Sequence, residues 1–209
     1  MQQALLELND VHKSFDAFKV TDGISLKLNQ GEALGIIGPN GAGKSTLFNL
    51  IAGGYTPDQG SVIFQGKDVT YESVAKRCHQ GIGRSYQIPH PFAGMSVFEN
   101  LLVGATFGTG RKEAECYDDC VEILQRTGMM KRANTTAGSL TLLERKRLEM
   151  ARALATNPKL LLLDEIAGGL TEQECFALVG TIKDIHAAGT TIIWIEHIVH
   201  ALLSVVGKL

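Results

Sequence analysis

The 209-residue chain contains 44% hydrophobic and 20% charged residues, which supports a packed core in one large domain or in one domain with an inserted lobe. Its formal net charge of −2 provides no general attraction to nucleic acid, so we expect no nucleic-acid partner. The longest apolar stretches, KLLLLDE and TTIIWIEH, are too short to cross a bilayer, and MQQALLELNDV lacks the pattern of a signal peptide. These features predict a cytoplasmic protein with no more than a peripheral membrane role.

The first 80 residues alternate short strands with helical segments. Apolar patterns predict strands at about 4–11, 23–29, 32–38 and 61–69. A loop with the sequence PNGAGKS follows the third strand and leads into a helix over 45–54, which Gly53 and Gly54 close. A second helical segment is expected over 71–80.

The chain changes character after this segment and predicts a helical lobe that begins near Pro89. SVFENLLVGATFG and RKEAECYDDCVEILQRTGM show the 3.6-residue apolar period of helices, with no convincing strand between them. They are followed by a helix that starts near Leu140, a strand over 159–165, a helix over 171–188 and a strand over 190–196. Continuous apolar strands that alternate with helices favour a parallel sheet covered on both faces.

GPNGAGKS matches the phosphate-loop pattern G-x-x-x-x-G-K-[ST] and lies between an apolar strand and a helix, as that pattern requires. Glycines let the backbone N–H groups approach phosphate oxygens, and the helix N-terminus adds its positive dipole end. Lys44 would supply a positive charge to the β- and γ-phosphates, and Ser45 would supply a hydroxyl to Mg²⁺. The predicted nucleotide-binding residues in this stretch are Gly38, Pro39, Asn40, Gly41, Ala42, Gly43, Lys44, Ser45 and Thr46.

Two adjacent carboxylates end the apolar strand KLLLLDE. Asp164 is placed to hold Mg²⁺ beside the phosphate loop, where carboxylates commonly bind the ion through water. Glu165 points to the other side of the strand and could orient or deprotonate a water that attacks the γ-phosphate. Without the phosphate loop, solvated acids at a strand end would be the favoured interpretation of this pair.

The rest of the chain distinguishes among phosphate-loop families. It lacks the N-K-x-D that GTPases use to read guanine, and it has no clear arginine-rich lid of a small-molecule kinase. IGPNGAGKSTLFNLIAG, GRSYQIPHPFAGMSVFENLLVGA, LLLLDE and TIIWIEH closely resemble, in this order, the Walker A, Q-loop, Walker B and switch regions of ABC transporter ATP-binding subunits. The resemblance covers nearly the whole chain. The sequences of the Q-loop and of IEH are most similar to those of importers of branched-chain and other amino acids.

This resemblance implies a role for several single residues. Glu165 would be the catalytic glutamate, Gln87 the Q-loop glutamine, and His197 the switch histidine near the γ-phosphate. Ser45, Gln87 and Asp164 would form the Mg²⁺ site. The cofactors implied are therefore ATP and Mg²⁺.

The same resemblance implies the fold. The family has an α/β P-loop NTPase fold of the ABC nucleotide-binding type, with an N-terminal antiparallel β subdomain and an inserted helical lobe. We expect the whole chain to form one such domain, with a core of about 1–88 and 155–209 and a lobe of about 89–154. Near the N-terminus, KSFDAFKV resembles the loop that stacks on adenine, with Phe15 as the expected aromatic residue and Phe18 as its rival.

The resemblance also implies what the protein does. A subunit of this kind hydrolyses ATP to energise the uptake of amino acids, here branched-chain ones, through membrane permease partners. It would work on the inner face of the cell membrane as a homodimer or a heterodimer with a second ATP-binding subunit, and indirectly with a periplasmic solute-binding protein. Phe92 and Met95 could contact the permease or could pack in the core. The alternative function is a non-transport or binding-only regulatory ATPase.

LTLLE occupies the position of the family signature L-S-G-G-Q, which caps the γ-phosphate held by a second subunit. Thr141 replaces the serine and can still donate a hydroxyl to ATP. Leu142 and Leu143 add bulk in place of two glycines, and Glu144 adds a negative charge that nearby cations would have to offset. We therefore expect the chain to hydrolyse ATP best when a partner supplies a more typical signature. The basic residues that follow are expected mainly on a solvated helix face: Arg145, Lys146, Arg147 and Arg152.

Overall fold

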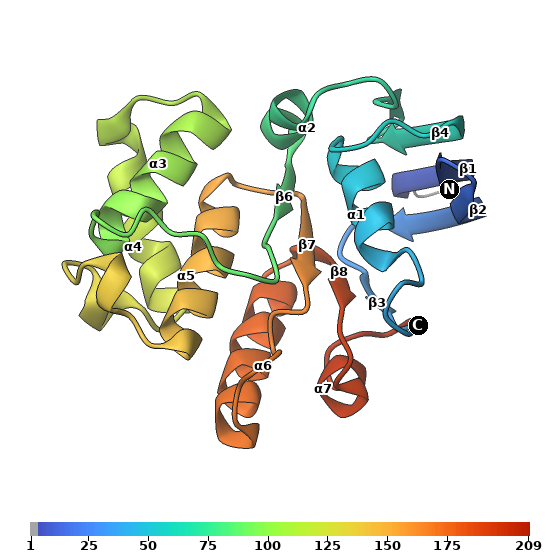
Figure 1. The fold of residues 1–209 in the computed structure, drawn as a ribbon. Coiled ribbons are helices and arrows are strands. Elements are labelled where there is room, and N and C mark those ends of the chain that lie inside the picture. Colours follow the sequence, from blue (N-terminus) through green and yellow to red (C-terminus); the bar gives the residue numbers. More distant parts are fainter. Residues whose placement is uncertain (1–3) are drawn as a thin grey trace.

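The computed structural model describes residues 4–209, which fold into two β-sheets and a group of helices (Figure 1). The N-terminal sheet is antiparallel and has the strand order β2-β1-β4-β5, as the resemblance implied. Its strands are β1 (Ala4–Phe15), β2 (Phe18–Asn29), β4 (Gln59–Phe64) and β5 (Lys67–Asp68). The single strand predicted over 61–69 is wrong, because Gln65 and Gly66 have φ angles of 51° and 73°. Two such residues in succession form the tight turn of a hairpin.

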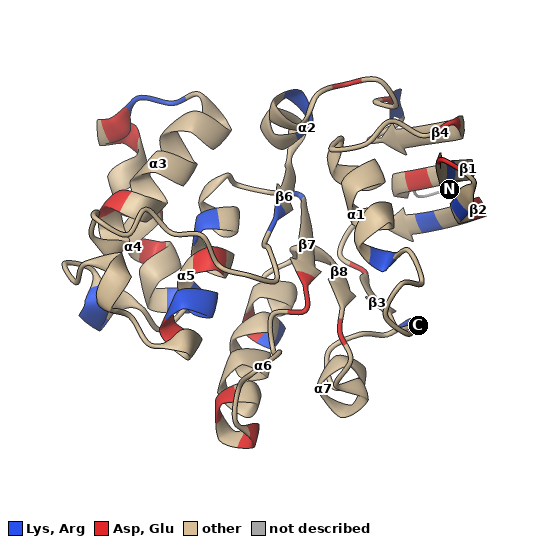
Figure 2. Cartoon of the chain, viewed as in Figure 1, with Lys and Arg blue, Asp and Glu red and all other residues tan. Residues whose placement is uncertain are grey.

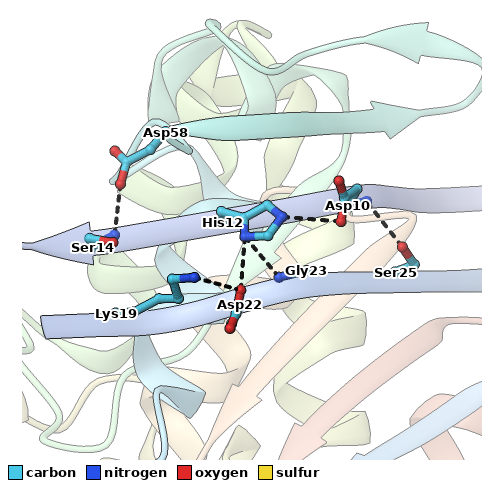
Figure 3. Close-up of polar contacts among 8 residues, drawn as sticks. All are labelled: Asp10, His12, Ser14, Lys19, Asp22, Gly23, Ser25 and Asp58. Carbon is cyan, nitrogen blue, oxygen red and sulfur yellow. Dashed lines mark hydrogen bonds and ion pairs between the residues drawn. The ribbon is translucent and has the colours of Figure 1, made fainter.

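Polar contacts hold the β1–β2 hairpin in register (Figure 3). The backbone N–H of Gly23 donates to His12 Nδ1 at 3.1 Å, and His12 Nε2 lies 3.1 Å from Asp10 Oδ1. The N–H of Ser14 donates to Asp58 Oδ2 at 2.7 Å, which attaches the turn before β4 to the end of β1. The hairpin is therefore held by contacts between its own strands and by the turn before β4. It lies next to the loop that precedes the first helix.

The second sheet is parallel and has the strand order β3-β8-β7-β6. Its strands are β3 (Ala33–Ile36), β8 (Thr191–Ile195), β7 (Leu160–Asp164) and β6 (Ile82–Arg84). Every residue of β7 and β8 is buried, as expected for parallel strands covered on both faces. Strand β6 was not predicted, because its three residues, IGR, are too few to show a period.

Helices cover the two faces of the parallel sheet. Leu160 and Leu162 of β7 pack in the cluster that contains the first helix, whereas Leu161 and Leu163 pack with the later helices. The predicted helices over 45–54 and 171–188 are confirmed as α1 (Lys44–Ala52) and α6 (Glu172–Ala187). The remaining helices of this part are α2 (Val74–Gln80), within the predicted segment, and the short α7 (Val199–Leu203), which was not predicted.

Three helices form a separate group on the side of the molecule away from the antiparallel sheet (Figure 1). They are α3 (Val97–Thr109), α4 (Tyr117–Arg126) and α5 (Leu142–Ala155). Their shared core includes Leu101, Leu124 and Leu148, all fully buried. Helix α5 begins slightly later than predicted because Thr141 is its N-cap and, with Glu144, forms a capping box. Among residues 4–209, no helix is both long and apolar enough to span a membrane.

Candidate active site

The loop between β3 and α1 folds back around the Lys44 side chain. Lys44 Nζ donates to the carbonyl oxygens of Gly38 at 2.8 Å and Pro39 at 2.9 Å. Gly41 and Gly43 have φ angles of 84° and 83°, a region that strains residues with a side chain. Helix α1 starts directly after Gly43, so the N–H groups of its first turn are directed at the loop. This arrangement suits the binding of an anion such as a phosphate.

A cavity of about 410 Å³ opens beside this loop. It brings the loop together with the segment after β6 and the end of β7, although these lie far apart in the sequence. Figure 2 shows acidic residues at the ends of β7 and β8, and basic residues on β6 and at the start of α1. The lining residues are Val20, Asn40, Gly41, Ala42, Gly43, Lys44, Ser45, Thr46, Gln87 and Glu165. The structure therefore gathers most of the predicted site residues around one space.

Glu165 lies between the two other residues predicted to act in catalysis. Gln87 Nε2 donates to Glu165 Oε2 at 2.6 Å, and His197 Nε2 lies 2.6 Å from Glu165 Oε1. The Glu165 backbone has a φ of 46°, which is uncommon for a residue other than glycine, and its N–H donates to the carbonyl of Ile195 at 2.9 Å. Side chains from the ends of three different segments thus meet at the edge of the cavity.

Asp164, the last residue of β7, is buried beside an arginine that is not among the predicted site residues. Arg84 Nη2 donates to Asp164 Oδ2 at 2.9 Å, and Arg84 Nη1 donates to Asn49 Oδ1 at 2.7 Å. The side chains of Arg84 and Asp164 are only 9% and 7% exposed. The only sign of this pair in the sequence was the charge of Arg84, three positions before Gln87. Arg84 lies in a strand too short to be predicted.

The oxygen donors at this place fit Mg²⁺. Ser45 is exposed at the start of α1 and lines the cavity with Gln87, whereas Asp164 is buried and is not among the lining residues; its Oδ1 is the carboxylate oxygen that Arg84 does not contact. The described part of the chain holds no group of three His, Cys, Asp or Glu residues suited to a metal ion. A cation here would therefore depend on nucleotide phosphates and water for its other ligands, as Mg²⁺ commonly does.

Two charged residues behind Glu165 are buried. Lys146 is 4% exposed, so the predicted solvated helix face is wrong for this residue; it lies four positions before the buried Met150, on the same face of α5. Its Nζ lies 3.4 Å from the carbonyl oxygen of Gln87 and 3.5 Å from that of Glu165. Glu196, at the end of β8, is 1% exposed. Burial lowers the pKa of Lys146, and burial together with the charge of Glu165 raises the pKa of Glu196 to about 7.

Replacement of Glu196 by Gln is expected to change how stability depends on pH. Since the pKa of Glu196 is raised from 4.5 to about 7, the folded protein keeps a proton in this window that the unfolded chain has lost. The contribution of Glu196 to the stability of the wild type should therefore fall by about 3 kcal/mol as pH rises through the window, and Gln removes this contribution. Denaturant unfolding at pH 5 and pH 8 measures it. An equal stability difference between variant and wild type at both pH values would contradict the prediction.

Phe15 does not line the cavity. Its ring packs edge-on against Tyr55, with ring centroids 5.2 Å apart, and Lys13 Nζ lies 5.7 Å from the ring centroid. Phe18, its rival, is paired with it across the end of the β1–β2 hairpin and is largely exposed. Adenine stacking by either residue stays a prediction.

Thr141 also lies outside the cavity, at the N-terminus of α5. Its Oγ1 accepts the Glu144 N–H at 3.4 Å and lies 3.1 Å from Glu144 Oε2, to which it can donate. The Glu144 carboxylate pairs with Arg132 at 2.7 Å and accepts the Thr141 N–H, and the pKa of Glu144 is lowered mainly by this backbone hydrogen bond. The cation that offsets Glu144 is therefore Arg132, rather than a basic residue of α5.

A phosphate-binding loop between a buried parallel strand and a helix, facing the Glu165 carboxylate at the end of β7, two strands away from β3 in the same sheet, defines a P-loop nucleoside triphosphatase. Among P-loop nucleoside triphosphatases, the antiparallel sheet and the separate group of helices are the two features expected of the ABC nucleotide-binding type. The sequence profile described as "ABC transporter" matches residues 21–168. The chain belongs to the ABC transporter family, as the sequence motifs predicted. It is the ATP-binding domain of this family, which is a family of ATPases.

Known relatives and structures extend along almost the whole chain. A protein of Methanocaldococcus jannaschii named as the probable branched-chain amino acid transport ATP-binding protein LivG is 34% identical over 98% of this chain and 84% of its own length. The galactose/methyl galactoside import ATP-binding protein MglA of Clostridium tetani is 32% identical over 98% of this chain, which spans 42% of that protein. The crystal structure of a nucleotide-free ATP-binding cassette from an ABC transporter is similar with a TM-score of 0.88, 33% identity and coverage of 98% and 85% of the two chains.

Proposed function

We propose that this chain is the ATP-hydrolysing subunit of an importer for amino acids, with branched-chain amino acids as its substrates. The contact of Glu165 with both Gln87 and His197 at the edge of the phosphate-loop cavity carries the proposal of hydrolysis. Similarity to proteins named LivG supports the amino-acid substrate. Similarity to a protein named as a galactose importer makes sugars the competing class.

The chemistry assigns a separate task to each residue of the cavity. Lys44 and the N–H groups of the loop bind the phosphates of ATP. Ser45 and Asp164 would hold Mg²⁺, which neutralises phosphate charge when bound. Glu165 orients the attacking water and accepts its proton. Gln87 and His197 hold the Glu165 carboxylate, so movement of either segment changes its position.

A second cavity, of about 320 Å³, is proposed as the contact for a permease subunit. It is lined mainly by apolar side chains between α2, α3 and α5, and it includes Tyr86 and Phe92 from the loop that also carries Gln87. Phe92 is half-exposed and packs under Arg152, whose guanidinium carbon lies 5.0 Å from the ring centroid. A permease segment bound here would contact the Gln87 loop directly, which couples transport to hydrolysis.

Two such domains would work as a dimer, with this chain as one or both halves. Leu142 is exposed at the start of α5, and Glu144 is held by Thr141 and Arg132 instead of being free to contact a partner's nucleotide. These features support a heterodimer in which the second subunit supplies the more typical signature. The complex would lie on the inner, cytoplasmic face of the cell membrane and receive its solute from a periplasmic binding protein.

Uptake by vesicles that contain the complete complex tests the proposal. The chain would be purified with its permease and ATP-binding partner subunits and reconstituted with a solute-binding protein. We expect ATP-dependent accumulation of labelled leucine, and its loss with the Lys44→Ala variant. Accumulation of galactose but not leucine would reject the amino-acid substrate. Hydrolysis without uptake of either solute would favour a regulatory ATPase.

A further inference from the structure

Arg84 connects the two structural elements that carry the proposed Mg²⁺ ligands. One nitrogen of its guanidinium donates to Asp164 at the end of β7, and another donates to Asn49 in α1. The Asn49 side chain in turn donates to the carbonyl oxygen of Ser45 at 2.9 Å. Arg84 therefore contacts Asp164 directly and reaches the backbone of Ser45 through the Asn49 side chain.

The surroundings of Arg84 hold it in this position. Its guanidinium carbon lies 4.9 Å from the ring centroid of Tyr86 and 5.6 Å from that of Phe48, so aromatic rings from two elements pack against it. The ion pair with Asp164 is almost completely buried. A buried carboxylate without a partner is strongly unfavourable, and Arg84 supplies that partner for Asp164.

We propose that Arg84 is a positioning residue: it is the resident counter-ion of Asp164, and it sets how much Mg²⁺ the site requires. The proposal rests on the proposed role of Asp164 as a metal ligand. A positive charge hydrogen-bonded to one carboxylate oxygen opposes the approach of a second cation to the other oxygen. The guanidinium also links α1 to β7 through its contacts with Asn49 and Asp164.

The Arg84→Met variant removes the charge and keeps much of the side-chain volume. We expect half-saturation of ATP binding to need about tenfold less Mg²⁺ than in wild type, the ratio that corresponds to one charge-assisted hydrogen bond. In the absence of Mg²⁺ and nucleotide, the melting temperature should fall by about 10 °C, because the buried Asp164 has lost its partner. The Arg84→Met/Asp164→Asn double variant should regain part of this loss.

Arg77 offers a matched control. It is also a buried arginine, 1% exposed, but within residues 4–209 it donates only to backbone carbonyl groups, among them those of Leu50, Ile51 and Thr70. Arg77→Met should lower the melting temperature and leave the Mg²⁺ requirement of ATP binding within twofold of wild type. Arg84→Lys, which keeps the charge, should fold more stably than Arg84→Met and change the Mg²⁺ requirement less.

The measurements are calorimetric ATP binding over a series of Mg²⁺ concentrations and thermal melts of the whole protein. An Mg²⁺ requirement that is unchanged or increased in Arg84→Met, while Asp164→Asn weakens the response to Mg²⁺, would overturn the role of Arg84 alone. An unchanged response in Asp164→Asn would instead reject Asp164 as the metal ligand, and the inference with it. A reduced requirement in Arg84→Met but not in Arg77→Met is the result we predict.

Discussion

Replacement of Glu165 by Gln is expected to lower MgATP hydrolysis by about 10²- to 10⁴-fold, the usual contribution of a positioned general base. Gln can still accept a hydrogen bond, but its amide cannot take a proton from water. The partners of Glu165 come from two other segments, Gln87 and His197, each 2.6 Å from one carboxylate oxygen. The variant should therefore keep most of this contact set, and with it the shape of the site.

ATP binding separates loss of chemistry from loss of the site. We expect Glu165→Gln to bind ATP within a few-fold of wild type, because the phosphate contacts belong to the loop at residues 38–46. Lys44→Ala is the opposite control, since it should weaken ATP binding itself. A Glu165→Gln variant that hydrolyses ATP at a wild-type rate would mean that another group accepts the proton.

Replacement of Gly43 by Ala is expected to reduce ATP affinity by about 10- to 100-fold, as 1–3 kcal/mol of backbone strain is transferred to the binding loop. Gly43 has a φ of 83°, and a Cβ there would lie 2.6 Å from the carbonyl oxygen of Val20 in β2. The β1–β2 hairpin is held by its own contacts, so the loop has to move instead. Any such movement displaces the start of α1, where the phosphates are expected to bind.

Gly189 provides the control for this substitution. Its φ is 95°, and within 4 Å a Cβ there would meet none of the described atoms. Gly189→Ala should therefore lower stability through strain alone and leave ATP affinity unchanged. Calorimetric titration with ATP, after both variants have been shown to be folded, compares the two. Equal affinity for Gly43→Ala and wild type would contradict the assigned role of the loop.

The parallel sheet could be predicted from the sequence because strands that are buried on both faces consist of uninterrupted runs of apolar residues. The strands predicted over 159–165 and 190–196 are confirmed as β7 and β8. Strand β6 could not be predicted in this way, since its three residues owe their conformation to pairing with β7. The same holds for the hairpin turn at Gln65 and Gly66, which interrupts a strand whose residues otherwise favour extension.

The candidate site was predictable where a spacing fixes the chemistry, as in the phosphate loop, and where a strand ends in acidic residues. It was not predictable where a charge is buried by contacts from distant segments. Arg84 meets Asp164 across 80 positions of sequence. Lys146 is buried although its neighbours on α5 are partly exposed. Its contacts with the carbonyl groups of Gln87 and Glu165 are known from the structure and could not be inferred from the sequence.

The rate of MgATP hydrolysis per subunit tests the central claim most directly. It would be measured for the chain alone over a range of protein concentrations, and again after addition of the permease and of a second ATP-binding subunit with a typical signature. We predict a low rate for the chain alone that increases with concentration, a higher rate in the complex, and loss of both in Glu165→Gln. Absence of hydrolysis in the complex, or a rate unaffected by Glu165→Gln, would contradict this assignment.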